Sequence, residues 1–597
     1  MLLALRILGL ALATTSTVAL AASVTPAETP AQREARDRQV DRAALAAQDR
    51  AIAVLDRLIG KYRGTEQEAA FLERLADLHQ QSAAIQFRLA HGMAKSSKVD
   101  LTRNHAELQA TVKALDRLIT VYPSYPELQK AWFMRGKAHE DLEEKPQAKR
   151  DYLEVSKKYA ETDEAVPANM ALANFAVEDN RHQEAIGYLK QVEKRPDSPH
   201  YPFALYKMAW SYYNLKDVPQ SLRYLEKEVA YYRHSASERG GRLDSSENAI
   251  LENALSDVAT FYFEGTQADH ATYGADAAFK YFRAMDSSPI LGRMLARYAK
   301  LLRSRKDEPT LRQFKELCLQ GEPQRPESLE VANLLYEYLL NDRRYKDLPA
   351  VAADFVRAHR AGGSALVASD AHKQSEKLLT DTATLLEKLA LKNKGIAGSE
   401  FLSQSLVAIY AAFLDMVPGQ DPRVYAVHFN LAETLFALDR YEDATAHYRW
   451  IVDRAAADSA SLKPMEKAGL SLKTASLRAL GSRYKSLKAA GTIPKDLAAR
   501  ATAGVSRQEP GAQLAEWLGW LDFHLKSWGY HDPSLDKFRF EATRAIYVLG
   551  RFDEALPLLL KAALERSSSD VAQGSAGLLM DTRIADQDWE TLFNEAG

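Results

Sequence analysis

The apolar positions of this chain recur three and four residues apart, which is the period of an amphipathic helix. The clearest example is the segment LDRLI at residues 55–59, which is repeated at residues 115–119. In both copies a tyrosine follows three residues later, and a small residue follows fourteen residues after the tyrosine. These pairs are Tyr62 with Ala76 and Tyr122 with Gly136. A match that includes its flanks indicates that one helix–turn–helix unit was copied within the chain.

Small residues mark the same unit in the centre of the chain. Ala148, Ala185 and Ser221 lie 37 and 36 residues apart. A small side chain lets a neighbouring helix approach closely, and large apolar residues three or four positions away fill the remaining space. One such hairpin cannot bury its apolar face alone, so the units have to stack. We therefore predict an all-α fold, an α-solenoid of stacked helix–turn–helix repeats. Further small positions are Gly136, Ala173, Ala209 and Ala432 in first helices, and Ala444 and Ala555 in second helices.

This pattern resembles the tetratricopeptide repeat family, with large–small–large positions on the first helix and small–large positions on the second. The Tyr122-Pro123 pair also fits the proline that often ends a repeat in that family. The resemblance is clear over residues 52–229 and 423–454 and weaker over 540–566. It implies a right-handed superhelix, with degenerate repeats in the middle and C-terminal sections.

The repeat length adds a second resemblance. Units of 36–37 residues exceed the standard 34. Longer units that end in tyrosine and proline are similar to those of bacterial envelope proteins. Examples are outer-membrane assembly lipoproteins, the coordinator of the Tol–Pal system and the repeat proteins of gliding motility.

Length, composition and charge narrow the class of protein. A length of 597 residues is too great for one compact core. With 28 glycines and 22 prolines, helix breakers are scarce, which favours long helices. The net charge of −2 gives no electrostatic reason to expect nucleic-acid binding. No later segment is long and apolar enough to be expected to span a bilayer.

The N-terminus predicts export. Arg6 gives a weakly basic start, Ile7–Ala13 is apolar, and a small-x-small pattern ends at Ala21. This order is typical of a secretory signal peptide cleaved near Ala21, with an uncleaved signal anchor as the alternative. The one cysteine, Cys318, is far from that site, so a lipobox and a lipid anchor are not expected. In a Gram-negative bacterium the predicted location is the periplasm.

The chain divides by composition into seven sections. The polar, glycine-containing segment 234–246 predicts an exposed loop, and the glycine-containing segment 361–369 predicts a linker. A further segment, 492–511, precedes a distinct C-terminal section. The predicted sections are a signal peptide (1–21), a flexible or helical start (22–50), a repeat array (51–233), a repeat with polar loop inserts (234–288), degenerate helical repeats (289–394), further repeats (395–491) and a C-terminal helical section (492–597).

Sequence motifs for catalysis are missing. The sequence contains neither a glycine-rich phosphate loop nor His-Glu-x-x-His nor Gly-x-Ser-x-Gly. His524 and His531 could share a helix face, but Gly529 lies between them and only Asp532 is a nearby acid, so no metal site is expected. Cys318 lies among helical apolar positions, and a small buried hydrophobe is a simpler interpretation than a reactive thiol. We expect no catalytic residues, no metal and no cofactor.

Two aromatic groups are candidate binding surfaces. The first lies at helical spacing on a face that differs from the predicted core face of the same helix, and its members are Phe203, Tyr206, Trp210, Tyr213 and Asn214. The resemblance to tetratricopeptide proteins places this face in the concave groove that binds peptides or partner helices, with Asn174 of the preceding repeat nearby. Aromatic side chains are common binding hot spots. The alternative is that the five residues only pack against adjacent first helices.

The second group is Trp517, Trp520, His524 and Trp528, whose steps of three and four place them on one helix face. A helical core explains such a stripe, and a docking patch or a sugar-stacking surface is the alternative.

Together these features predict a non-catalytic periplasmic scaffold. Its expected partners are other envelope proteins. One option is that the scaffold associates with an outer-membrane complex. The alternatives are a glycan-binding protein or enzyme with a C-terminal active section, and a cytoplasmic adaptor.

Overall fold

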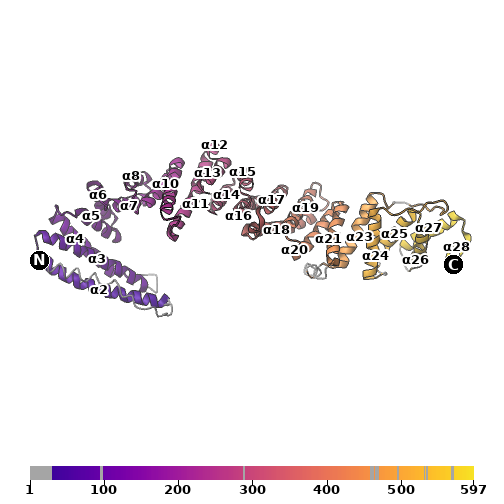
Figure 1. Ribbon diagram of the computed structural model, residues 1–597, viewed down its shortest axis with the longest axis horizontal. Helices are drawn as coiled ribbons and strands as arrows, with labels where there is room; N and C mark the ends of the chain where they lie inside the picture. The colour runs from indigo at the N-terminus through magenta and orange to yellow at the C-terminus, as the bar shows by residue number, and fades with distance from the viewer. Residues whose placement is uncertain are drawn as a thin grey trace. The chain divides into compact units, whose positions relative to one another are not determined.

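The computed structural model describes residues 30–93, 99–286, 289–457, 463, 470–493, 497–529, 532, 535–565 and 570–596, and the regular elements in these ranges are all helices (Figure 1). The predicted signal peptide lies outside the described residues. The chain forms two compact units, one that ends at Leu243 and one that begins at Asp244.

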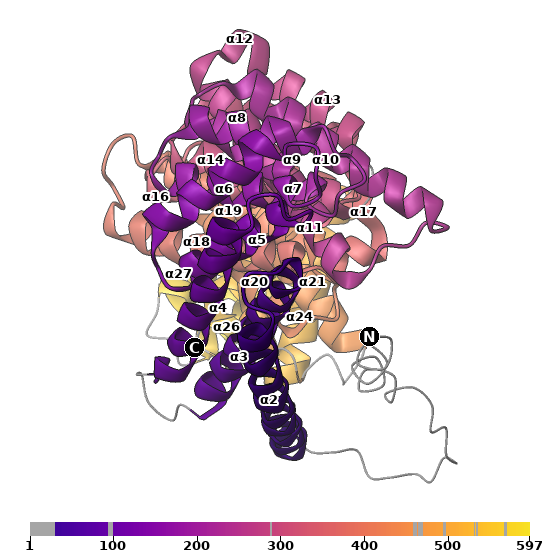
Figure 2. The same ribbon diagram turned by 90° about the vertical axis from the view of Figure 1, so that its left-hand side faces the viewer.

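Unit 1 consists of helices that pack against their neighbours in chain order. The long α2 and α3 lie side by side, as Figures 1 and 2 both show. The helices are α2 (Pro30–Lys61), α3 (Glu66–Met93), α4 (Thr102–Val121), α5 (Leu128–Asp141), α6 (Lys145–Lys158), α7 (Ala165–Glu178), α8 (His182–Glu193), α9 (Tyr201–Asn214) and α10 (Val218–Glu238). From α5 onward the pairs α5/α6, α7/α8 and α9/α10 are the predicted first and second helices of three repeats.

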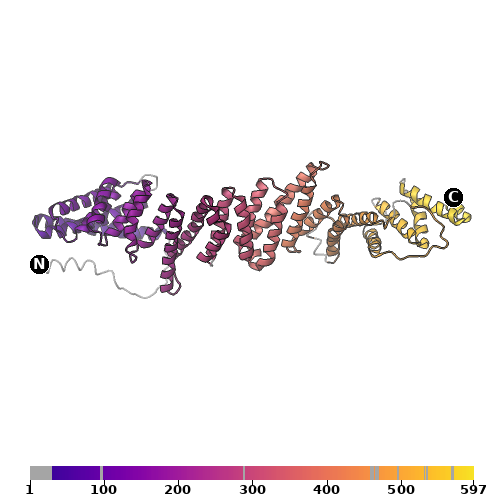
Figure 3. The same ribbon diagram turned by 90° about the horizontal axis from the view of Figure 1, so that it is seen from above.

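Unit 2 continues the same scheme with less regular helix lengths, and Figure 3 shows its helices side by side along the chain. They are α11 (Ser245–Ala268), α12 (His270–Tyr273), α13 (Ala275–Met285), α14 (Pro289–Ser304), α15 (Glu308–Gly321), α16 (Pro326–Asn341), α17 (Leu348–Val367), α18 (Asp370–Lys392), α19 (Glu400–Met416), α20 (Pro422–Ala437), α21 (Tyr441–Ala457), α23 (Leu472–Ala489), α24 (Ala512–Trp528), α25 (Asp536–Val548), α26 (Phe552–Leu564), α27 (Asp570–Asp586) and α28 (Trp589–Ala596). The predicted all-α solenoid of paired helices is confirmed.

The predicted small positions lie where paired helices touch. A Cβ atom on Gly136 of α5 would lie 2.9 Å from the ring of Tyr152 on α6, so only glycine fits there without a shift. Ala173, Ala209 and Ala432 are fully buried in their first helices. The small residues of the second helices, which are Ala148, Ala185, Ser221, Ala444 and Ala555, are also fully buried. The packing that the spacing predicted is therefore present in both units.

The turn inside each repeat has a regular backbone conformation. In unit 1 a left-handed residue follows each first helix at Glu143, Asn180 and Lys216, which are 37 and 36 positions apart. The next amide then bonds back to the helix end, as from Glu144 N to the carbonyl oxygen of His139 at 2.8 Å. This is the Schellman arrangement, which satisfies carbonyls that the helix end would otherwise leave open. Unit 2 repeats it at Lys306, Arg343, Asp439, Gly550 and Gln587. The degenerate repeats of the middle section thus keep the turn geometry after losing the sequence pattern.

A tyrosine of the second helix often donates its hydroxyl hydrogen to a glutamate of the first helix. Tyr152 bonds to Glu140 at 2.6 Å, and Tyr448 bonds to Glu433 at 2.5 Å. The same pairing joins Tyr410 of α19 to Glu387 of α18. Burial, followed by the nearby carboxylate, raises the pKa of each tyrosine, so the hydroxyl remains a donor. These bonds fix the rotation of one helix of a pair relative to the other.

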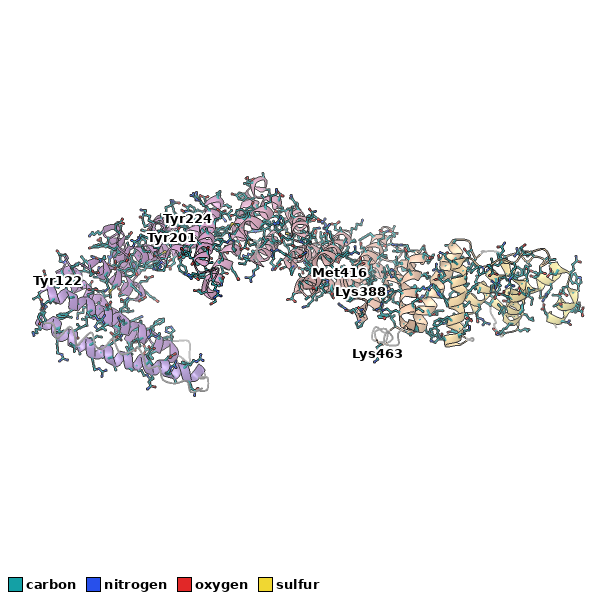
Figure 4. All side chains as sticks on the ribbon, viewed as in Figure 1. Tyr122, Tyr201, Tyr224, Lys388, Met416 and Lys463 are labelled. Carbon is teal, nitrogen blue, oxygen red and sulfur yellow. The ribbon has the colours of Figure 1, made fainter. Side chains whose placement is uncertain are left out.

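The copied LDRLI unit supplies a buried ion pair in unit 1. The carboxylate of Glu68 on α3 is fully buried, and it accepts bonds from Arg117 Nε at 2.5 Å and from Tyr122 Oη at 2.5 Å. Figure 4 labels Tyr122 at the end of α4. The bond from Arg117, together with the smaller contribution of Tyr122, lowers the pKa of Glu68 to about 2 despite its burial. Both donors belong to the second copy of the unit, so this copy connects α4 to the start of α3.

Two predicted non-helical segments differ from the structure. Helix α10 continues through His234 to Glu238, because residues 234–238 lack a strong helix breaker, so the exposed loop contains only residues 239–244. The predicted linker at 361–369 is largely helical and contains a kink at Gly363, which has a φ of 63°. The predicted flexible or helical start at 22–50 is helical from Pro30 onward.

The residues that connect α23 to α24 are packed against the C-terminal helices. Arg500 donates from its guanidinium to the carbonyl oxygen of Val548 at 2.6 Å, and Thr502 N donates to Asp586 Oδ1 at 2.6 Å. Gly550 has a φ of 70°, and a Cβ atom there would lie 2.8 Å from the carbonyl oxygen of Ser506. The described residues 497–511 therefore form a strap across α25, α26 and α27.

A matched pair of substitutions tests the helix contact. We expect Gly136→Leu to destabilise the protein by about 1–3 kcal/mol because the new side chain overlaps the Tyr152 ring. Gly187→Leu, on the exposed side of α8 with no atom within 4 Å of a Cβ, should be neutral or stabilise by up to about 1 kcal/mol. Thermal unfolding followed by circular dichroism compares the two. Equal effects would contradict the packing described for α5 and α6.

Candidate protein-binding surfaces

The predicted aromatic face lies on α9, the first helix of the third regular repeat of unit 1. Phe203 is 46% exposed, while Leu205, Met208 and Ala209 on the opposite face are fully buried. The remaining members of the face are half-buried or exposed, and they are Tyr206, Trp210, Tyr213 and Asn214. The helical spacing therefore separates a core face from an outer aromatic face, as the sequence predicts.

The outer face of α9 is organised by contacts between its own residues. Trp210 packs edge-on against Tyr206 with ring centroids 6.4 Å apart, and against Tyr213 at 5.2 Å. Asn214 Nδ2 donates to the carbonyl oxygen of Trp210 at 2.8 Å, and Lys216 Nζ lies 5.3 Å from the centre of the Tyr213 ring. Such rings lose little conformational freedom when a partner binds, because they are already held. The face combines a large aromatic area with amide and ammonium donors.

Asn174 is on α7, the first helix of the preceding repeat. Its side chain is half-buried, and the amide oxygen has no hydrogen-bond partner among the described residues. It follows Ala173, the small position of its helix, by one residue, as Trp210 follows Ala209. Asn174 and Trp210 thus occupy equivalent positions in successive repeats.

The C-terminal tryptophans do not form one surface. Trp517 is fully buried, and its Nε1 donates to the carbonyl oxygen of Leu480 at 3.0 Å. His524 is also fully buried, and its Nδ1 lies 2.9 Å from Ser476 Oγ. For Trp517 and His524 the structure supports the helical core over the alternative of a docking patch, because the inner side of the stripe packs against α23. Trp520 and Trp528 remain half-buried.

Trp520 lines a small pocket between α21, α23 and α24. The pocket has a volume of about 230 Å³, and Phe523 and Arg449 contribute to its walls. The guanidinium of Arg449 lies 4.7 Å from the centre of the Trp520 ring, and that of Arg483 lies at 5.5 Å. Two cations at such distances occupy much of the π-face that a sugar would need.

A groove that the sequence did not reveal lies between α18, α19 and α20 of unit 2. Its volume is about 340 Å³, with an apolar lining that includes Ile409 and Phe413. Glu387 at its edge accepts from Tyr410 and from Asn430 Nδ2, the latter at 3.0 Å. Figure 4 labels Lys388 on α18 and Met416 on α19, the helices of two of its walls. The lining residues come from three helices, so no single stretch of sequence could show them.

A larger groove of about 830 Å³ lies along α25, with α24 and α26 as its walls. Its apolar residues include Leu521, Ile546 and Leu558. Arg539 at its edge is paired with Glu565 at 2.7 Å, and Arg551 is paired with Glu554 at 2.7 Å. The volume is within the range of small-molecule pockets, but the charged groups at the edge bond to one another.

Titratable groups in the interior form two histidine pairs. His428 Nδ1 lies 2.9 Å from His447 Nδ1, and His359 Nδ1 lies 2.9 Å from His372 Nε2. Burial, together with the charges of His447 and Arg454, lowers the pKa of His428 to about 3. The described residues contain no group of three or more metal-binding side chains. The pairs are explained by a hydrogen bond between one protonated and one unprotonated nitrogen.

Cys318 is fully buried on α15, and burial raises the pKa of its thiol well above the usual value. A thiol in this environment stays protonated and is a poor nucleophile. Of the two interpretations of Cys318, the structure supports the buried hydrophobe.

Within the described part of the chain, no helix is both long enough and apolar enough to cross a bilayer.

The comparison with protein families agrees with the repeat geometry of α9 and α10. A family model of the tetratricopeptide repeat matches residues 203–235, which cover most of α9 and α10. None of the curated proteins matches the sequence. Among solved structures 116 chains match, and one of them, from "Structure of Naa15/Naa10 bound to HypK-THB", aligns with 12% identity and a TM-score of 0.30 over 94% of this chain and 92% of that chain. The matched repeat and the helical solenoid together indicate a protein-interaction scaffold.

The histidine pairs predict a specific pH dependence. The fold holds His428 neutral, whereas the unfolded chain takes up a proton near pH 6.5, so stability is lost as the pH falls below about 6.5. From this residue we expect a loss of about 2 kcal/mol between pH 7.5 and pH 5. A variant with His428→Gln and His447→Gln should show a flatter decline of its thermal midpoint over this range. The exposed His91→Gln should keep the wild-type decline, and equal declines in all three proteins would contradict the assignment.

Proposed function

We propose that this protein is an exported scaffold of the bacterial cell envelope that binds a segment of a partner protein on the aromatic face of α9. The observation that carries the proposal is Phe203, which is 46% exposed within the residues matched by the tetratricopeptide repeat. A large apolar side chain at such a position contributes binding free energy once a partner covers it. Asn214 and Lys216 would fix the orientation of the bound segment through hydrogen bonds.

The proposed mechanism requires shape and no chemical step. Successive first helices present equivalent positions, so a segment that follows the array would meet Asn174 on α7 and then Trp210 on α9. Because the aromatic rings are already packed against one another, the surface is largely formed before binding. The solenoid fold typically serves as a non-catalytic scaffold, in agreement with this role.

The alternative of a glycan-binding C-terminal section has less support. It requires exposed aromatic faces, and Trp517 is in the core while Trp520 lies beneath two arginines. Sedimentation of the full chain with purified peptidoglycan tests this alternative. Co-sedimentation that Trp520→Ala abolishes would favour it over the proposed scaffold.

Recovery of partners from cross-linked envelopes tests the α9 face. We expect Phe203→Ala to reduce the recovery of at least one specific envelope protein about tenfold or more, because the exposed ring is lost while the core of α9 is unchanged. The matched control is Phe87→Ala on α3, since Phe87 is also 46% exposed. Equal recovery with both variants, or with a double variant that adds Trp210→Ala, would contradict the proposed surface.

The predicted export has a separate test. N-terminal sequencing of the mature protein should find a start near Ala22, because the signal peptide is expected to be cleaved after about Ala21. Fractionation should then recover the protein from the periplasm. A mature protein that retains Met1 in the cytoplasm would favour the adaptor interpretation.

A further inference from the structure

The last two described helices expose large apolar side chains. Met580 and Ile584 of α27 are 42% and 45% exposed, and Trp589 and Phe593 of α28 are 55% and 81% exposed. Each pair is four residues apart, so each forms a stripe on one side of its helix. We call these four residues the C-terminal apolar surface.

These side chains are not needed to hold the two helices together. Leu578 and Leu579 of α27 are buried and face the preceding helix α26 in the core of this region. Helix α28 is held on α27 by polar contacts, with Arg583 donating to Glu595 at 2.9 and 3.1 Å. Asp588 also accepts from Thr591 N at the start of α28. The apolar side of α28 therefore remains available for another molecule.

Helix α2 of unit 1 has a more polar exposed side. The exposed positions of α2 are mostly Arg, Asp, Gln, Glu and Ala, and its exposed large apolar residues are Val40 and Val54. Helices α27 and α28 instead place an aromatic pair and two aliphatic residues outward. Large apolar side chains that are exposed together on two contacting helices are typical of interaction sites.

The charge around the surface limits which partner can bind. Residues 570–595 contain six acidic residues and one basic residue, Arg583. Asp581 and Glu590 are exposed, and the described residues include no ion-pair partner for either. A second copy of this chain would bring two acidic surfaces together, and an anionic lipid surface would be repelled in the same way. Charge complementarity favours a basic partner.

We infer that the C-terminal apolar surface binds an amphipathic helix of a partner protein whose apolar stripe is flanked by lysine or arginine. Trp589 and Phe593 would pack against the apolar stripe, and Asp581 and Glu590 would pair with the basic flanks. Helix recognition of this kind uses apolar anchors three and four residues apart, which matches the spacing on α27 and α28. This site is separate from the α9 face, so it would give the scaffold a second attachment point.

Binding of two synthetic helical peptides to the full chain tests the inference. Both carry the same leucine stripe, and one has lysine flanks where the other has glutamate flanks. We expect fluorescence anisotropy to show at least tenfold tighter binding of the lysine peptide. Its affinity should fall at least tenfold in the Trp589→Ser, Phe593→Ser variant. In the Asp581→Asn, Glu590→Gln variant it should fall about threefold and become less sensitive to salt.

Matched controls distinguish binding at this site from non-specific hydrophobic binding and from binding at the α9 face. Leu391→Ser with Ile396→Ser removes two other exposed apolar side chains of unit 2 and should leave the affinity unchanged, as should Phe203→Ala. Equal binding of both peptides, binding that survives Trp589→Ser with Phe593→Ser, or no binding would overturn the inference. Self-association or adsorption to anionic vesicles that the same variant abolishes would also overturn it, by identifying another occupant.

Discussion

The close contact between the two helices of a repeat is the constraint on which the rest of the structure depends. At Gly136 a single added carbon would overlap the Tyr152 ring, and the corresponding positions in other repeats hold buried alanines. Helices at this distance bury their apolar sides only if the next pair packs against them. The stack, the outward direction of the remaining side chains and the presence of extended surfaces all follow from this contact.

Polar interactions support that contact both in the clear repeats and in the degenerate ones. The tyrosine-to-glutamate bonds of α5/α6, α18/α19 and α20/α21 hold pairs in both units. The left-handed turn residue recurs at Lys306 and Arg343, 37 positions apart, in a region where the repeat pattern is hard to read in the sequence. Repeats can thus lose their apolar signature and still keep their geometry, because the turn and the hydroxyl bonds are local.

The sequence predicted the features that depend on spacing. The LDRLI copies, the small residues at 36–37-residue intervals and the two faces of α9 all follow from helical periodicity, and the structure contains them. The turns were not predictable, because Glu143 and Lys216 are poor candidates for a left-handed conformation. Residues 497–511 look like a linker, but their amides and Arg500 bond to helices about fifty or more residues away along the chain. Long-range contacts of this type leave no local pattern.

Periodicity also fails to tell which side of a short helix faces inward. Trp517 and His524 belong to a stripe that could have been a surface, and they are core residues because α23 packs against them. Trp589 and Phe593 are four residues apart on α28, yet they are exposed, because no described helix covers them. The difference lies in the neighbouring helix and not in the stripe itself. In a stacked array, an apolar stripe is core where a neighbouring helix covers it, and where none does it is available to another molecule.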